Sequence, residues 1–108
     1  MITDVNQLTG AALDWAVAKC EGVEFTYEDH PTHELIVFQY SINWVQGGPI
    51  IEREGIALLQ RPMGYWVATS QCGRTCEGDT PLIAAMRAYV VSKLGSTVDV
   101  PDELLEAV

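Results

Sequence analysis

Positively charged residues are scarce in this chain of 108 residues. Lys and Arg together number 6 against 15 Asp and Glu, which gives a formal net charge of −9. A protein that binds nucleic acid or an anionic membrane neutralises phosphates with many cations, so direct binding to either is disfavoured. A negative surface instead suits solubility, a basic protein partner or the imitation of a polyanion.

Long apolar runs are missing as well, and cysteines are few. No run reaches the roughly 18 apolar residues that a transmembrane helix needs, and the first residues show no basic leader followed by an apolar stretch. The three cysteines are an odd number, which is typical of free thiols in a reducing compartment. We therefore expect a cytoplasmic protein without a membrane span.

The composition, 48% hydrophobic and 19% charged, predicts a single globular domain over residues 1–108. Its pattern predicts an α+β fold with two main helices packed on one face of a small, mostly antiparallel sheet, and a short C-terminal helix. Apolar spacing places the main helices at 7–20 and 80–94, with Asn6 and Thr80 as N-caps. Alternating and β-favouring runs place strands at 23–27, 35–40, 56–60 and 65–70.

The remaining segments are expected as follows. Residues 1–5 are loose, residues 71–79 form a polar loop, and the last short helix begins at Val100. In the first main helix Asp14 faces water. The second main helix buries one stripe of side chains: Ile83, Met86, Val90 and Leu94.

The most unusual segment is 44–56, which contains a Trp, a Gly-Gly-Pro sequence and a Glu-Arg-Glu triplet in close succession. The glycine pair predicts a bend, with Pro49 opening a short helix over 50–54. Trp44 either packs beneath this bend or lies with Arg53 at the rim of a recognition surface, because Trp and Arg dominate interface energetics. The candidate binding residues are Trp44, Gly47, Gly48, Pro49, Glu52, Arg53 and Glu54.

Two loops contain possible metal ligands. His30, His33, Cys72 and Cys76 could together form a tetrahedral zinc site, or the cysteine pair could form a reversible disulfide with Arg74 lowering a thiol pKa. The spacing matches neither the usual zinc pattern nor the redox motif. We therefore expect no metal and no cofactor.

Catalytic motifs are not evident. Ser70 lacks the Gly-x-Ser-x-Gly context of a hydrolase nucleophile, and the pair at 47–48 is not followed by the Lys-Ser or Lys-Thr of a phosphate-binding loop. The sequence therefore argues against an enzyme. The alternative that stays open is a small hydrolase or ligand-binding protein that uses Glu52 and Arg53 in a pocket roofed by Trp44.

Three blocks, at 8–19, 47–54 and 80–87, resemble the NinX-like proteins of tailed phages and prophages. They appear in the order expected for that family and span most of the chain. The resemblance implies a small cytoplasmic protein encoded by a phage or prophage, and it implies no activity. The blocks include Trp15, Glu52, Arg53 and Arg87, which makes these side chains candidates for a shared role.

The function expected from these observations is that of a non-enzymatic accessory protein. It would bind a host or phage protein through residues 44–54, with no direct contact to nucleic acid or membrane. The alternative is a nucleic-acid mimic that inhibits a host DNA-binding protein through acidic residues near the C-terminus: Asp99, Asp102, Glu103 and Glu106.

Overall fold

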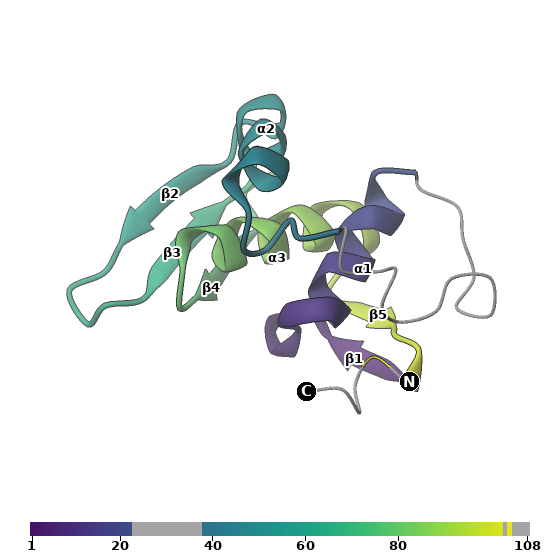
Figure 1. The fold of residues 1–108 in the computed structure, drawn as a ribbon. Helices are drawn as coiled ribbons and strands as arrows, with labels where there is room; N and C mark the ends of the chain where they lie inside the picture. The colour runs from purple at the N-terminus through teal and green to yellow at the C-terminus, as the bar shows by residue number, and fades with distance from the viewer. Residues whose placement is uncertain (23–37, 103, 105–108) are drawn as a thin grey trace.

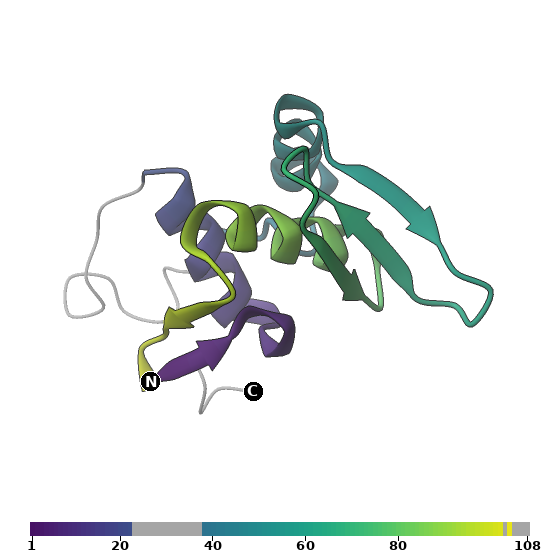
Figure 2. The same ribbon diagram turned by 180° about the vertical axis from the view of Figure 1, so that it is seen from behind.

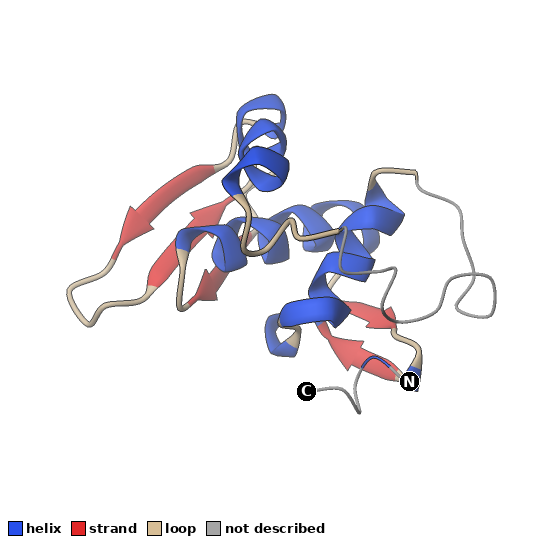
Figure 3. Ribbon diagram, in the orientation of Figure 1, coloured by secondary structure: helices blue, strands red, loops and turns tan. Residues whose placement is uncertain are grey.

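The computed structural model describes residues 1–22, 38–102 and 104, and within them the expected α+β fold is confirmed. The other helices and two small sheets are arranged around a central helix (Figure 1, Figure 3). The helices are η1 (Val5–Gln7, a 3-10 turn), α1 (Gly10–Cys20), α2 (Trp44–Glu54) and α3 (Pro81–Leu94). The strands are β1 (Ile2–Asp4), β2 (Ala57–Gln60), β3 (Trp66–Thr69), β4 (Thr75–Gly78) and β5 (Thr97–Asp99).

The central helix is α3, and its predicted ends are confirmed. The Thr80 hydroxyl accepts a hydrogen bond from the Ile83 N–H at 3.1 Å, and Gly95 follows the last residue with a φ of 90°, a conformation that favours glycine. Most of the helix is buried between the other elements. Leu94 was expected to be buried but is exposed, because the chain turns away at Gly95 toward β5.

One face of α3 covers an antiparallel sheet in the order β2-β3-β4. The strands expected at 56–60 and 65–70 are confirmed as β2 and β3, which pair as an antiparallel hairpin, and Leu58, Ala68 and Cys76 lie side by side on the inner face. The prediction of a polar loop over 71–79 was wrong at its end, where β4 pairs with β3. Gly78 permits the close approach, because a Cβ there would lie 2.6 Å from the Ala84 nitrogen on α3.

The second sheet joins β1 to β5, at the end of α3 away from the first sheet (Figure 2). The prediction that residues 1–5 are loose was therefore wrong. Ile2 pairs with Asp99 and Thr3 with Val98, and the Met1 amino group bonds the Asp99 carboxylate at 2.6 Å. These contacts join strands near opposite ends of the sequence, so no local sequence pattern predicts them.

The first helix is shorter than predicted, because Thr9 rather than Asn6 precedes it. Asn6 lies in η1, whose N-cap is Asp4. The expected apolar stripe is present in Leu13 and Val17, which are fully buried and belong to the core shared with α3. Asp14, expected to face water, is buried.

The second helix differs most from the prediction. It begins at Trp44, not at Pro49, and runs through the Gly-Gly-Pro sequence without a break. The Asn43 side chain caps it by accepting a hydrogen bond from the Val45 N–H at 2.9 Å, and Gly55, with a φ of 63°, ends it as expected. Packing against α3 outweighs the low helix propensity of its glycines.

Several predictions fall outside the described residues: the strand at 23–27, the loop with His30 and His33, and residues 35–37 of the next strand. The part of that strand that is described, 38–40, is not a strand. Asp102 and Leu104 are helical, which fits the short C-terminal helix. Among the described residues, no helix is both long and apolar enough to cross a membrane.

Candidate functional site

The start of α2 exposes an unusual amount of apolar surface. Ile42 is 67%, Trp44 53% and Val45 82% exposed. Beside them lies an open hollow of about 220 Å³, bounded by Ile42 and Trp44 on one side and by the first turn of α3 on the other. We call Ile42, Trp44, Val45 and this hollow the Trp44 face.

One residue that borders the hollow carries a buried polar group. Ser41 is 1% exposed, and its hydroxyl oxygen has no hydrogen-bond partner among the described residues. Burial raises the pKa of Asp14, and the nearby backbone and side chain of Ser41 oppose that rise. The rest of the lining is largely apolar and comes from Pro81, Leu82 and Ile83.

The glycine pair in the middle of α2 positions this face. Gly47 is buried, and a Cβ there would overlap the Tyr40 carbonyl oxygen and lie 2.7 Å from Leu82 on α3. Only glycine therefore lets α2 pack this closely on its neighbours. Gly48 is less restricted, because a Cβ there would meet only the Trp44 ring, at 3.7 Å.

The other end of α2 carries an ion-pair cluster that joins three helices. The Arg53 guanidinium donates to Glu21, which follows α1, from Nη1 to Oε1 at 3.1 Å and from Nη2 to Oε2 at 2.6 Å. Arg53 Nη2 also donates to the hydroxyl of Tyr89 on α3 at 3.0 Å, and that hydroxyl donates to Glu21. Arg53 Nε binds Glu54 at 2.8 Å, and Lys93 lies 3.6 Å from the same carboxylate.

The cluster shifts the protonation equilibria of its members. Hydrogen bonds from Arg53 hold the pKa values of Glu21 and Glu54 below their ordinary range. Burial, reinforced by Glu21, raises the pKa of Tyr89. Arg53 thus stays a cation between two carboxylates, and the charge of this end of α2 is largely neutralised within the molecule.

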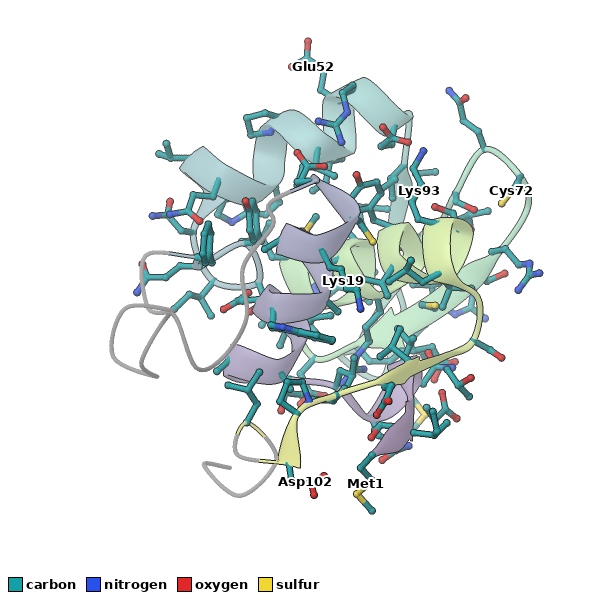
Figure 4. The ribbon with its side chains drawn as sticks, turned by 90° about the vertical axis from the view of Figure 1, so that its right-hand side faces the viewer. Met1, Lys19, Glu52, Cys72, Lys93 and Asp102 are labelled. Atoms are coloured by element: carbon teal, nitrogen blue, oxygen red, sulfur yellow. The ribbon has the colours of Figure 1, made fainter. Side chains whose placement is uncertain are left out.

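The candidate residues therefore divide into two groups. Trp44 and Arg53 are nine residues apart in one helix, roughly 13 Å along its axis, and neither Glu52 nor Arg53 lines the hollow beside Trp44. Glu52 points away from the rest of the molecule (Figure 4), and Pro49 is exposed. The structure does not bring Glu52 and Arg53 beneath Trp44.

Residues 4–93 match the family model described as Bacteriophage P22, NinX.

The chain belongs to the NinX family.

The matched span contains η1, all three α-helices except the last residue of α3, and the sheet of β2, β3 and β4. Membership in the NinX family indicates a phage-encoded accessory protein. A comparison with individual curated proteins gives no match. Every candidate residue of α2 lies within the family match, as do Glu21, Tyr89 and Arg87.

Sequence reasoning missed Glu21, Tyr89 and Lys93 as partners of Arg53. Lys93 lies in the last turn of α3, and Tyr89 belongs to the buried core. The one usable signal was the Glu-Arg-Glu triplet, because a guanidinium flanked by acids is often held by them. Which distant acid completes the cluster depends on how α1 crosses α3, and no local pattern gives that angle.

The cysteines of the NinX-family chain occupy different environments. Cys72 is exposed, whereas Cys76 is buried against α3, and both are free thiols. The Ser70 hydroxyl lies 3.1 Å from the Cys72 sulfur, and this contact lowers the pKa of Cys72. Within the described ranges no group of three or more His, Cys, Asp or Glu side chains could hold a metal ion; His30 and His33 lie outside these ranges.

Proposed function

We propose that this NinX-family chain is a non-enzymatic protein-interaction module that binds a host or phage protein through the Trp44 face. The observation that carries the proposal is the exposure of Ile42, Trp44 and Val45 together at the start of α2. Contiguous apolar surface of this kind in a small protein marks a site of association. Tryptophan is also among the residues that contribute most to binding when an interface buries them.

The hollow beside Trp44 supports the proposal. Its size, about 220 Å³, suits one apolar side chain of a partner, which would be enclosed between the Trp44 ring and the first turn of α3.

The ion-pair cluster supports a different role for Arg53. Its guanidinium makes hydrogen bonds to Glu21, Glu54 and Tyr89, so it joins the three helices and holds α2 in place. We therefore separate the two residues that the sequence grouped together. Trp44 belongs to the binding surface and Arg53 to its support.

The test is capture of partners from lysate of phage-infected host cells, read by quantitative mass spectrometry. Trp44→Ala should reduce capture by about 30-fold or more, the loss expected when a hot spot worth about 2 kcal/mol is removed. The matched control is Met63→Ala, which truncates an equally apolar and 87% exposed side chain in the β2–β3 turn. Met63→Ala should capture the partner as the wild type does.

The salt dependence of capture distinguishes this proposal from nucleic-acid mimicry. An apolar anchor predicts that capture survives a rise in ionic strength, whereas an acidic mimic loses its partner steeply as charges are screened. Equal capture by wild type and Trp44→Ala, together with loss of the partner in added salt, would favour mimicry. Equal capture without salt dependence would place the binding surface elsewhere.

A further inference from the structure

A second hollow, separate from the Trp44 face, contains the partly buried guanidinium of Arg87. It has a volume of about 410 Å³ and lies between η1 and the strands β3 and β4. This volume is within the range of small-molecule sites in proteins. Its lining residues are Asn6, Gln7, Val67, Thr75, Cys76, Glu77 and Arg87.

Arg87 uses only part of its hydrogen-bonding capacity on the protein. Nε donates to the Leu8 carbonyl oxygen at 3.0 Å and Nη1 donates to the Glu77 carbonyl oxygen at 2.7 Å. A guanidinium has five N–H donors, so about three remain for other acceptors. In the part of the chain that the structure describes, no carboxylate forms an ion pair with Arg87, in contrast to Arg53.

This arrangement is unusual for a partly buried charge. Burial lowers the pKa of Arg87, and the charges of Asp79, Cys76 and Asp4 oppose that effect without forming an ion pair. A cation taken partly out of water is normally paired. Through these two carbonyl contacts Arg87 links the end of η1 to β4. A carbonyl oxygen carries no full negative charge, so the contacts do not neutralise Arg87, and part of its guanidinium remains free beside the hollow.

The remaining lining is divided between polar and apolar groups. Asn6, Gln7 and Thr75 present neutral side chains that can donate hydrogen bonds. Val67 presents apolar surface, Glu77 adds one acidic group, and Cys76 is almost fully buried. A few convergent polar groups beside an apolar wall are what a small ligand with one polar end requires.

We propose that this hollow is a binding site for a small monocarboxylic acid, with its carboxylate on Arg87 and its apolar part against Val67. The planar guanidinium matches a carboxylate in shape and charge. The site offers a single cation, with Asp4, Asp79 and Glu77 close by, so a monoanion is favoured over a dianion such as phosphate.

The test is an NMR titration of the ¹⁵N-labelled protein with acetate, butyrate and inorganic phosphate, at constant pH and ionic strength. Butyrate should cause saturable shifts at the backbone amides of Thr75 and Glu77 and at the side-chain amides of Asn6 and Gln7. Acetate should bind more weakly because it lacks the apolar part, and phosphate should not saturate. Equal effects of all three anions, or binding of phosphate alone, would overturn the proposal.

Two variants locate the site. Arg87→Lys keeps the charge but loses the planar fork, and it should weaken butyrate binding by about tenfold. Arg61→Lys, the same change on an exposed arginine in the β2–β3 turn, is the matched control and should bind as the wild type does.

Arg87→Lys also disturbs the contacts to Leu8 and Glu77, so a second variant leaves Arg87 intact. Thr75→Phe places a bulky side chain at an exposed strand position on the lining and should abolish the butyrate shifts. If butyrate binds Thr75→Phe with unchanged affinity, the hollow is not the binding site.

Discussion

The carboxylate of Asp14 on α1 accepts a hydrogen bond from the backbone N–H of Ser41, at 2.8 Å and across 27 residues of sequence. Asp14 is only 6% exposed. Burial raises its pKa even though the Ser41 N–H opposes the shift. This contact fixes the residues just before α2 onto α1, so it helps to set the position of the Trp44 face.

The first prediction concerns this contact. Asp14→Ala should lower the free energy of unfolding by about 1–3 kcal/mol, because it leaves the buried Ser41 N–H without an acceptor. Asp14→Asn is the matched control, since its amide oxygen can still accept that hydrogen bond, and it should cost much less. Urea unfolding of both variants at neutral pH measures the difference; equal losses would contradict the role of the hydrogen bond.

The same site has a pH signature. The folded protein keeps the Asp14 proton to a higher pH than the unfolded chain, whose carboxyl has an ordinary pKa near 3.8. The contribution of Asp14 to stability therefore falls as the pH rises through 3.8 and then through the raised folded pKa. Across this window, Asp14→Asn should gain stability relative to the wild type as the pH rises.

The second prediction contrasts the two glycines of α2. Gly47→Ala should destabilise the fold by about 1–3 kcal/mol, the usual cost of forcing an extra methyl group into a packed site, because Tyr40 and Leu82 occupy the space. Gly48→Ala should instead stabilise it by about 0.5–1 kcal/mol through higher helix propensity. Thermal unfolding of the pair checks both signs, and a destabilised Gly48→Ala would show that α2 bends at this position.

The third prediction concerns the cluster around Arg53. Burial and Glu21 raise the pKa of Tyr89 more strongly than burial raises that of Tyr40, so Tyr89 should ionise after Tyr40 and give a late step in an ultraviolet titration. Glu21→Gln should lower the pKa of Tyr89, and Tyr89→Phe should remove the late step altogether. A late step that persists in Tyr89→Phe would assign it to another tyrosine.

Glu21 also gives the cluster a pH dependence opposite to that of Asp14. Arg53 holds the pKa of Glu21 below its ordinary value of 4.5, so the stability that Glu21 contributes is present above that pH and is lost as the pH falls through the lowered folded pKa. The wild type should therefore lose more stability than Glu21→Gln on acidification. Guanidinium unfolding of both proteins across this range measures it.

The fourth prediction orders the thiols by reactivity. Cys72 is exposed and its pKa is lowered by the Ser70 hydroxyl, whereas burial raises the pKa of Cys20 to about 12 and that of Cys76 above its ordinary value. Iodoacetamide should therefore label Cys72 first in the native protein, because the thiolate is the reactive form. Ser70→Ala should slow this labelling, as read by mass spectrometry; an unchanged rate would remove Ser70 as its cause.

The elements with strong local signals were predicted well. Thr80, Pro81 and Gly95 mark both ends of α3, and the turn at 61–64 marks the hairpin of β2 and β3. The failures share one cause, which is packing between distant segments. β4 forms because Gly78 meets α3, and α2 runs through Gly47 because that glycine faces Tyr40 and Leu82.

The candidate site follows the same rule. The residue type of Trp44 made it a candidate from the sequence, but its exposure depends on the tertiary structure and could not be predicted. The partners of Arg53 and the surroundings of Arg87 come from segments far away in the sequence. The chemistry of a single side chain is visible in a sequence, but the groups that surround it in the fold are not.

The packing of α1 on α3 has a consequence during protein synthesis. Leu13 and Val17 are fully buried in the core shared with α3, yet the ribosome must add about 70 residues after α1 begins before α3 begins. At translation rates of roughly 5–20 residues per second, this takes on the order of 4–14 s. Throughout that interval the nascent α1 has no α3 to cover its apolar side.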